Sequence, residues 1–214
     1  MKVLVLGASG GVGRHLVRLA AAGGHAVTAV SRSPMEVPPG VRLVLGDVGA
    51  AGVIDRAVAG HDAVLSSLGI KRRSPNPWSA LASPPDFSSA TARAVVAAME
   101  RHGVGRVIAV SAAGVGDSRA GLNVVMRVLL ATSKIGPMYQ DLDAMERVYA
   151  ASGLDWCCVR PTVLIDGPET GRVAVIEDFP TTAQIRRADV AAWMVERLGG
   201  ETGPRRTPTL TGAR

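Results

Sequence analysis

Aromatic residues and cysteines are scarce in this chain of 214 residues. Aromatics make up only 3% of the sequence, so the core must consist mainly of Ala, Val and Leu, which suits close packing of helices on a sheet. Cys157 and Cys158 are adjacent and lie in an apolar stretch. Adjacent cysteines rarely bridge and two do not make a metal site, so we expect two core thiols. The four histidines are scattered, and we expect no metal site.

Long apolar runs are also absent. A membrane span needs about 18 consecutive apolar residues, and no stretch of this chain reaches that length. The N-terminus leads directly into the apolar residues 3–6, without the basic region and cleavage site of a secretory signal. We therefore expect a cytoplasmic protein that has no membrane partner.

The charge balance is basic, with 24 Lys and Arg against 18 Asp and Glu and a net charge of +6. Most of the excess is dispersed arginine, apart from small clusters at residues 71–73 and in the tail at Arg205, Arg206 and Arg214. No basic stripe alternates with aromatics, so we expect no nucleic-acid partner. A dispersed basic excess suits a polyanionic small ligand. The sequence carries no signal for an oligomeric state.

Apolar segments of strand length alternate with helical patterns along the chain. The predicted strands cover residues 3–6, 26–30, 41–45, 63–65, 107–110 and 156–159. Helical patterns follow them; the last but one ends at Gly153, and the last buries Val190, Trp193, Met194 and Leu198. This alternation predicts βαβ units. We expect a single Rossmann domain over residues 1–214, of the α/β class, with a doubly wound, mainly parallel sheet and helices on both faces.

Three local expectations concern helix ends and loops. Ser88 or Ser89 can cap the helix that ends before Gly103, and Asp189 can cap the last helix. Four prolines make residues 70–87 irregular, and a loop of this length often carries function. Residues 199–214 are expected either to hold a short edge strand near Thr209 or to be frayed.

A glycine-rich turn follows the first strand and opens the first helix. It fits the pattern G-x-x-G-x-x-G and reads Gly7-Ala8-Ser9-Gly10-Gly11-Val12-Gly13. Gly7 permits the tight turn, Gly10 lets a diphosphate approach the backbone, and Gly13 allows close helix packing. Free N–H groups at the helix start would bind the diphosphate of a nicotinamide dinucleotide. The alternative is a glycine turn that binds no ligand.

The end of the second predicted strand bears on the choice between NADP(H) and NAD(H). NAD(H) binding usually needs an acidic residue there to bond the ribose 2′-hydroxyl, but this chain has Ser31, Arg32 and Ser33. Arg32 can neutralise a 2′-phosphate, and Ser31 or Ser33 can donate hydrogen bonds to it. We therefore expect NADP(H) rather than NAD(H). The alternative is that Arg32 is simply an exposed loop residue.

The third predicted strand ends in Asp47 and Val48. Asp47 could accept a hydrogen bond from the adenine amino group of the cofactor. It could equally cap the next helix, and the two roles are compatible.

Several segments together resemble one protein family. They are GASGGVG at residue 7, AVAGHDAV at 57, DAVLSSLG at 62, AVVAAMERHGVGRVIAVSA at 94, ASGLDW at 151 and LDWCCVRPT at 154. They are similar to the atypical short-chain dehydrogenase/reductase group, in particular to NAD(P)H-binding proteins related to flavin reductase and biliverdin-IXβ reductase, and to NmrA-like proteins. The resemblance covers nearly the whole chain.

This resemblance implies further cofactor contacts. It places Ser67, Leu68 and Gly69 beside the cofactor ribose. It places Ser111, Ala112 and Ala113 under the nicotinamide, and Pro161 and Thr162 near its carboxamide. All these segments follow predicted strands, and the carboxyl ends of parallel strands are where α/β sheets bind ligands.

Ordinary short-chain dehydrogenases use a Tyr-x-x-x-Lys pair, in which the lysine lowers the tyrosine pKa. That pair is missing here, because Tyr139 is followed four residues later by Asp143 and Tyr149 by Gly153. Alcohol–ketone chemistry of the ordinary kind is therefore not expected. In the flavin reductase relatives a serine at the Ser111 position lies near the substrate, which makes Ser111 the candidate catalytic residue. The alternative is that Ser111 only positions the nicotinamide.

Two functions are favoured over a third, a chaperone or assembly role with a bound cofactor. The first is an NADPH-dependent reductase that transfers hydride to a small planar acceptor such as a flavin, a quinone or a tetrapyrrole-like molecule. The second is a non-catalytic, NmrA-like redox sensor that binds NADP(H). An acceptor pocket would be roofed by residues 70–87, 114–139 and 166–184, whose candidate apolar contacts are Trp78, Met126, Met138, Tyr139 and Phe179. Arg160 is interpreted as mainly structural.

Overall fold

The central element is an eight-stranded sheet in the order β3-β2-β1-β4-β5-β6-β10-β8. The computed structural model describes residues 1–177, 180, 182–200 and 206–213. Strand pairing is parallel from β3 to β10, and only β8 runs antiparallel, against β10. The strands are β1 (Lys2–Leu6), β2 (Ala26–Ser31), β3 (Arg42–Leu45), β4 (Ala63–Ser66), β5 (Arg106–Val110), β6 (Asp155–Pro161), β8 (Val173–Ile176) and β10 (Thr209–Gly212).

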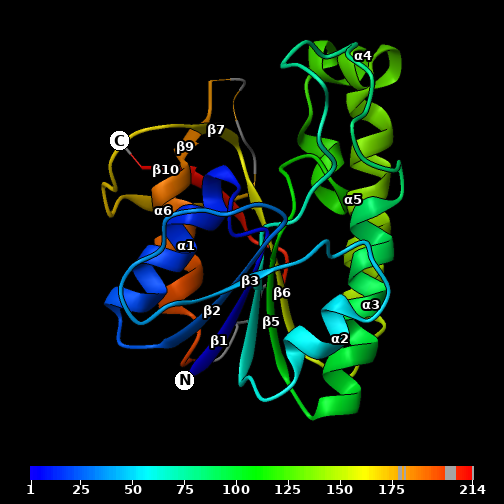
Figure 1. Cartoon of the computed structure of the whole chain (residues 1–214). Helices are drawn as coiled ribbons and strands as arrows, with labels where there is room; N and C mark the ends of the chain where they lie inside the picture. The colour runs from blue at the N-terminus through cyan, green and yellow to red at the C-terminus, as the bar shows by residue number, and fades with distance from the viewer. Residues whose placement is uncertain (178–179, 181, 201–205, 214) are drawn as a thin grey trace.

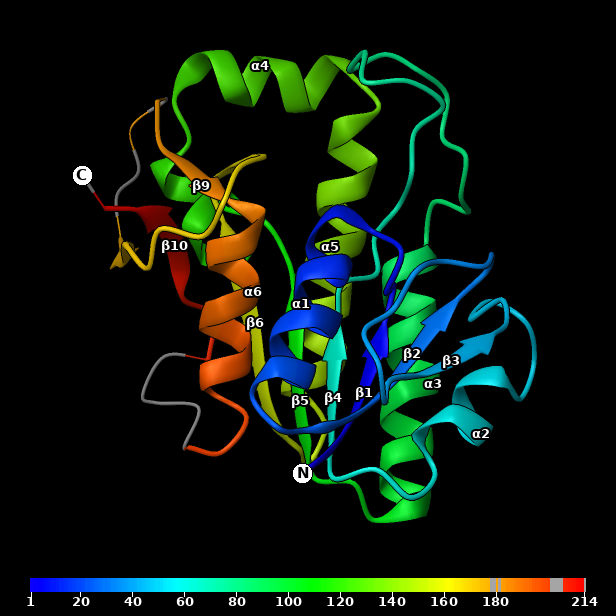
Figure 2. The same cartoon turned by 60° about the vertical axis from the view of Figure 1, so that its left-hand side comes forward.

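Helices cover both faces of this sheet (Figure 1). On one face lie α1 (Gly11–Ala22) and α6 (Arg187–Glu196), and on the other α2 (Val53–Val58), α3 (Phe87–His102) and α5 (Ile135–Ala150). A 3₁₀ helix, η1 (Gly116–Gly121), leads to α4 (Val124–Thr132), which crosses one end of the molecule in Figure 2. The predicted fold, a doubly wound and mainly parallel sheet, is confirmed.

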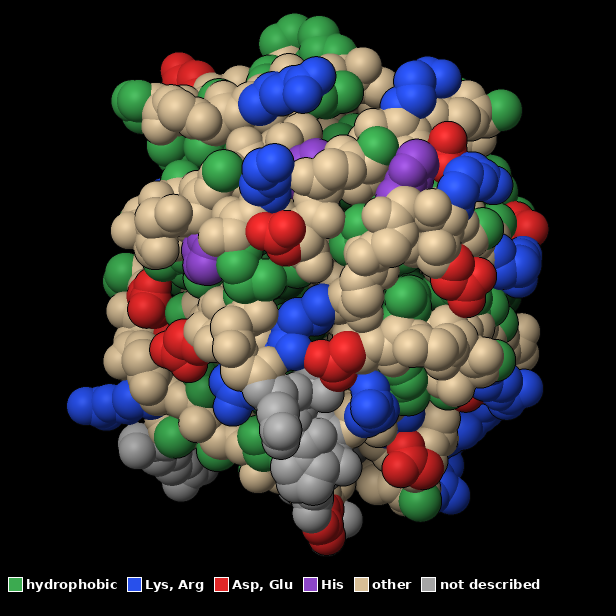
Figure 3. Space-filling model, turned by 90° about the horizontal axis from the view of Figure 1, so that it is seen from below, with side chains coloured by type: hydrophobic (Ala, Val, Ile, Leu, Met, Phe, Trp, Pro, Cys, Tyr) green, Lys and Arg blue, Asp and Glu red, His purple; other side chains and the backbone are tan. Residues whose placement is uncertain are grey.

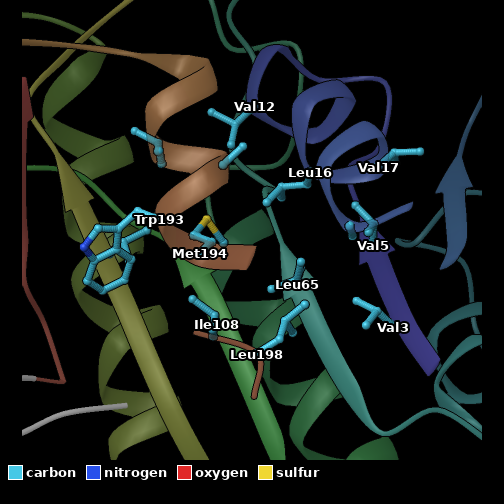
Figure 4. Packing of buried hydrophobic residues seen from close by; sticks show 14 of the residues in the cluster. Val3, Val5, Val12, Leu16, Val17, Leu65, Ile108, Trp193, Met194 and Leu198 are labelled. Atoms are coloured by element: carbon cyan, nitrogen blue, oxygen red, sulfur yellow. The ribbon is translucent and has the colours of Figure 1, made fainter. Parts of the chain in front are cut away.

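Strand β1 shows how the alternation of side chains builds two cores. Val3 and Val5 are fully buried on the side of α1 and α6, and Leu4 and Leu6 are fully buried on the opposite side. Figure 4 shows the first core, where Leu16 of α1 and Met194 of α6 meet the sheet side chains. A strand buried on both faces must be apolar throughout, which is why this segment has no alternating polar residues.

The order of the strands shows at which end of the sheet a ligand would bind. After β1 the chain crosses through α1 to β2 on one side, and after β4 it crosses through α3 to β5 on the other. β1 and β4 are neighbours, and the order of the strands reverses between them. At such a switch point the connections leave toward opposite sides, so a crevice opens beyond the carboxyl ends of the two strands. The opposite edge carries the amino ends of the strands, and there basic and acidic side chains are interspersed (Figure 3).

No helix in the described ranges combines the length and the apolar character that crossing a bilayer requires.

The start of α3 differs from expectation. The helix begins at Phe87, so Ser88 and Ser89 lie inside its first turn and are buried instead of capping it. The carboxylate of Asp141 in α5 caps this helix, accepting hydrogen bonds from the backbone N–H of Ser88 at 2.7 Å and of Ser89 at 3.0 Å. The cap therefore comes from a residue that lies 53 positions after Ser88 in the sequence.

Removing this cap should destabilise the protein. Asp141→Ala leaves two buried N–H groups without acceptors, and we expect the free energy of unfolding to fall by about 2 kcal/mol. The matched control is Asp143→Ala on the same helix, which removes only a surface pair with Arg147 and should cost less than about 0.5 kcal/mol. Urea denaturation of both variants measures the difference, and equal losses would contradict the role given to Asp141.

The C-terminal third holds elements that the sequence analysis did not predict. Strand β8 and the two-stranded parallel sheet of β7 (Val163–Ile165) and β9 (Gln184–Arg186) lie in a region for which no strand was predicted. A strand does form near Thr209, but β10 lies between β6 and β8 and not at the edge of the sheet. Residues 201–205 and 214 lie outside the described residues.

Asp189 also has a different role from the expected helix cap. Helix α6 starts at Arg187, so Asp189 lies within its first turn. Its carboxylate, 1% exposed, accepts hydrogen bonds from the N–H and hydroxyl of Thr170 and from the N–H of Gly171. It therefore ties the loop before β8 to α6.

Candidate functional site

The glycine turn brings the start of α1 unusually close to the end of β1. Gly7 has a φ of +76°, and a Cβ on it would lie 2.9 Å from the carbonyl oxygen of Ser67. A Cβ on Gly13 would lie 2.1 Å from the carbonyl oxygen of Gly7. Both contacts are with backbone atoms, which cannot swing aside. The turn therefore requires glycine at both positions, as the motif predicts.

The first turn of α1 is prepared for an anion. Its N-cap is Gly10, no side chain caps it, and no acidic residue lies in its first turn. The N–H groups at such a helix start point outward and carry the positive end of the helix dipole. A diphosphate is the kind of group that this arrangement binds.

Arg187 adds a positive charge beside this turn, and the sequence analysis did not single it out. A Cβ on Gly11 would lie 2.6 Å from its Cδ, so the arginine passes directly over the turn. Its guanidinium also pairs with the carboxylate of Asp166 at 2.8 Å, and that carboxylate side chain is 91% exposed. The contact arises because α6 packs beside α1, an arrangement that no local motif reveals.

A first pocket lies at the carboxyl ends of β1, β2 and β4. It brings together nine of the predicted cofactor residues, namely Gly7, Ser9, Gly10, Ser31, Arg32, Val48, Ser67, Leu68 and Gly69. Ser31 donates a hydrogen bond from its hydroxyl to the carbonyl of Ser33 at 2.8 Å, and the tight turn that results contains Arg32. Lys71 lines the same pocket, so two cations face one ligand site.

The 70–87 loop is irregular, as predicted, but it is ordered by its own hydrogen bonds. It folds back on itself through a bridge between Arg72 and Leu81, and the N–H of Ala82 donates to the carbonyl of Lys71 at 2.7 Å. This fold-back fixes the backbone of Lys71 at the pocket. The basic cluster at 71–73 signalled a cation, but only the folded loop shows that Lys71 is the one that lines the pocket.

Five other predicted cofactor residues do not line this pocket. Ala8 is fully buried and Val12 nearly so, in the core beneath the turn, so only their backbone could contact a ligand. Asp47 is exposed, and its carboxylate accepts from the N–H of Gly49. It does not cap α2, whose N-cap is Gly52. The remaining two, which belong to the start of α1, are Gly11 and Gly13.

A second pocket lies at the carboxyl ends of β5 and β6, next to the first in strand order. It has a volume of about 260 Å³. It gathers the predicted nicotinamide residues Ser111, Ala112, Ala113, Pro161 and Thr162. The hydroxyl oxygen of Thr162 is buried from solvent and has no hydrogen-bond partner among the described residues, so Thr162 lines the pocket through its other atoms.

The predicted roof of this pocket is confirmed only in part. Met126 and Tyr139 line it, together with residues of β7. Trp78 lines a separate hollow beside Lys134, and Met138 lines neither. Phe179 lies outside the described residues.

Ser111 is anchored from behind by a buried ionic network. Its N–H donates to the carbonyl of Val159 at 2.7 Å, and its hydroxyl donates to Oε1 of Glu146 at 2.5 Å. Arg160 also donates to both oxygens of Glu146, at 3.0 and 2.6 Å, and to Asp117. Burial alone would lower the pKa of Arg160, but its bonds to Glu146 and Asp117 outweigh burial and raise the pKa above its ordinary value.

The role predicted for Arg160 therefore has a structural basis, whereas Glu146 was missed. A glutamate inside a helix gives no sequence signal of this kind, because its partners come from β5 and β6. Helix α5 places it seven residues after Tyr139, on the side of the helix that faces the second pocket.

Tyr139 does not replace the missing catalytic pair. Burial raises its pKa, so the phenol remains protonated at neutral pH. Asp143, which stands where a lysine would lower that pKa, forms a surface pair with Arg147. The two cysteines, expected as core thiols, are both buried, and burial raises the pKa of Cys157 to about 12. Such thiols carry no reactive thiolate.

The residues present fit a dinucleotide. The glycine turn and the uncapped start of α1 suit a diphosphate, and the first pocket adds two cations. The second pocket, beyond the carboxyl ends of β5 and β6, lies at the same end of the sheet and leaves room for a further part of such a ligand.

Comparisons with known proteins agree with this geometry. The model of a family described as NAD(P)H-binding matches residues 7–200. An anaerobilin reductase from Escherichia coli O157:H7, ChuY, is 26% identical, with a TM-score of 0.79 over 99% of this chain and 97% of that chain. A short-chain dehydrogenase/reductase from Veillonella parvula, solved with NADP, is 20% identical, with a TM-score of 0.77 over 98% of this chain and 94% of that one.

Proposed function

Since the chain belongs to the family of NAD(P)H-binding proteins, we propose that it is an NADPH-dependent reductase of a small planar acceptor. The acceptor would be a flavin, a quinone or a tetrapyrrole-like molecule. The observation that carries the proposal is the pair of pockets at the ends of adjacent strands, one with two cations and one lined by Ser111 and mostly apolar side chains. When bound, the nicotinamide group supplies the hydride.

The residues of the first pocket hold the cofactor in this proposal. The backbone N–H groups at the start of α1 bind the diphosphate, and Arg187 neutralises part of its charge from above the turn. Ser67, Leu68 and Gly69 form the wall beside the ribose. Val48 forms the apolar wall beside the adenine, and the Asp47 side chain stays outside.

NADP(H) is favoured over NAD(H) by charge. Arg32 and Lys71 line one pocket, and no acidic side chain is among the residues that line it. A bound dianionic 2′-phosphate would offset the mutual repulsion of the two cations. The planar guanidinium of Arg32 can bind this phosphate with two hydrogen bonds. An acidic residue that would select the free 2′-hydroxyl is absent from the end of β2.

The second pocket holds the acceptor beside the nicotinamide. Its lining is mostly apolar, which suits a flat conjugated ring, and Met126 and Tyr139 supply soft contact surface. Ser111, which Glu146 holds in place, is one of the polar residues that line it. The proton that must follow the hydride can come from water, so the missing Tyr–Lys pair does not prevent reduction. The similarity to an anaerobilin reductase supports a conjugated acceptor of this kind.

The competing function is a sensor that binds NADP(H) without turning over a substrate. The absence of the Tyr–Lys pair favours it, because Asp143 stands in the lysine position. The apolar second pocket favours the reductase, since a sensor needs no cavity beside the nicotinamide.

One assay separates the two functions. The protein is mixed with NADPH and in turn with FMN, a quinone and biliverdin, and the nicotinamide absorbance is followed. The reductase predicts steady oxidation that Ser111→Ala lowers by about tenfold or more, since a hydrogen bond to the reacting region is lost. The control, Ser152→Ala, changes a hydroxyl that bonds only within the turn after α5 and should leave the rate unchanged. Tight NADPH binding with no oxidation by any acceptor would support the sensor.

A further inference from the structure

The hydroxyl of Ser111 already donates a hydrogen bond to a residue of the protein. Glu146, 6% exposed, accepts three hydrogen bonds, one from Ser111 and two from Arg160. Because the cationic guanidinium of Arg160 donates to both of its oxygens, the side chain of Glu146 acts as a hydrogen-bond acceptor.

It follows which way the Ser111 proton points. A serine hydroxyl has one proton and two lone pairs. At an oxygen–oxygen distance of 2.5 Å from Glu146, that proton must lie between the two residues. Ser111 also lines the second pocket, so a ligand that bonds to its hydroxyl oxygen from there meets lone pairs and no proton.

From this geometry we propose that Glu146 is a positioning residue that makes Ser111 a hydrogen-bond acceptor, and that the pocket thereby selects electron acceptors with an N–H donor. This inference rests on the proposed function and narrows its substrate class. A molecule that presents only a carbonyl oxygen to Ser111 would place its own lone pairs against those of the serine oxygen. Two acceptors form no hydrogen bond and repel each other. Quinones present only carbonyl oxygens in this way, whereas flavins and linear tetrapyrroles carry a lactam or imide N–H.

The test uses two flavins that differ in one proton. Lumiflavin has a single N–H, and 3-methyllumiflavin has none. Their dissociation constants are measured by calorimetry on the full chain saturated with NADP⁺, and their kcat/KM values with NADPH. We expect wild-type protein to prefer lumiflavin by about tenfold in both measurements, because one hydrogen bond is lost with the methyl group.

Two variants separate the hydrogen bond from the bulk of the methyl group. Glu146→Gln leaves one acceptor oxygen for three donors, so Arg160 keeps it and the Ser111 hydroxyl can turn toward the pocket. Ser111→Ala removes the hydroxyl and leaves the Glu146–Arg160 pair intact, which covers the case in which Glu146→Gln fails to fold. In each variant the preference for lumiflavin over 3-methyllumiflavin should fall to about threefold or less.

The outcomes are distinct. A preference that persists unchanged in Ser111→Ala reports steric bulk and overturns the inference, as does equal binding of the two flavins, or binding of neither, by wild-type protein. A purely structural role of Glu146 would lower both affinities equally and keep their ratio. If lumiflavin binds with the expected preference but no acceptor oxidises NADPH, the inference stands and the proposed reductase function fails.

Discussion

Replacing Gly13 with alanine should lower the affinity for NADPH by about a hundredfold, which corresponds to about 2.7 kcal/mol. In an ordinary helix this change would stabilise the protein by about 1 kcal/mol, since alanine is the better helix former. Here the new Cβ would lie 2.1 Å from the carbonyl oxygen of Gly7. The start of α1 must then move away from the end of β1, and the N–H groups that bind the diphosphate move with it.

The same clash should cost stability, about 2 kcal/mol in the free energy of unfolding, as overpacking does elsewhere. The matched control is Gly153→Ala, where an added Cβ has no neighbour within 4 Å and the backbone φ is not positive. That variant should bind NADPH like the wild type. Calorimetric titration and urea denaturation of both variants give the comparison, and normal NADPH binding by Gly13→Ala would show that the diphosphate is held elsewhere.

Reversing the charge of Arg32 should change the choice of cofactor. Arg32→Glu is expected to weaken NADPH binding by about a hundredfold, because a charge-assisted pair with the 2′-phosphate becomes a repulsion. NADH lacks that phosphate, so its affinity should change by no more than about threefold. Lys71→Gln should show the same selectivity with a smaller loss, since the flexible ammonium makes fewer bonds than the guanidinium.

The control for general charge effects is Arg42→Glu. Arg42 begins β3, the strand that pairs with β2, and lies at the amino end of the sheet, away from the pocket. It carries the same change in net charge and should affect NADPH and NADH equally and weakly. Equal losses of NADPH and NADH affinity in Arg32→Glu would refute the assignment to the 2′-phosphate.

The sequence predicted those parts of the fold that depend on nearby residues. Strand β1 is a short apolar run that both faces bury, and α1 follows from the spacing of Val12 and Leu16. The glycine turn was recognisable because its steric requirements fall within seven residues, from Gly7 to Gly13. The fold class followed, since strands and helices that alternate in this way pack as a parallel sheet.

Interactions between distant segments could not be read in this way. Asp141 caps a helix from 53 residues away, and Glu146 meets Ser111 across 35 residues. The preference of Ser, Thr, Asp and Asn for helix starts therefore misassigned the cap to Ser88 or Ser89, although the true cap is also an aspartate. Strand β8 was missed because it is short and partly exposed and gains its partner from β10, near the C-terminus.

The candidate site shows the same division. Residues that follow strands were found, because strand ends meet at one edge of the sheet. Lys71 and Arg187 reach the glycine turn and its pocket only through the fold-back of a loop and the pairing of two helices. Side chains that reach a site through the packing of distant segments leave no periodic pattern in the sequence. They can be assigned to the site only from the structure.

The most direct test is a calorimetric titration of the purified protein with NADP⁺ and, separately, with NAD⁺. Arg32, Lys71 and the uncapped start of α1 predict one site per chain that binds NADP⁺ at least about tenfold more tightly than NAD⁺. Heat changes that stay at the level of dilution for both dinucleotides would contradict the assignment of the glycine turn as a cofactor site.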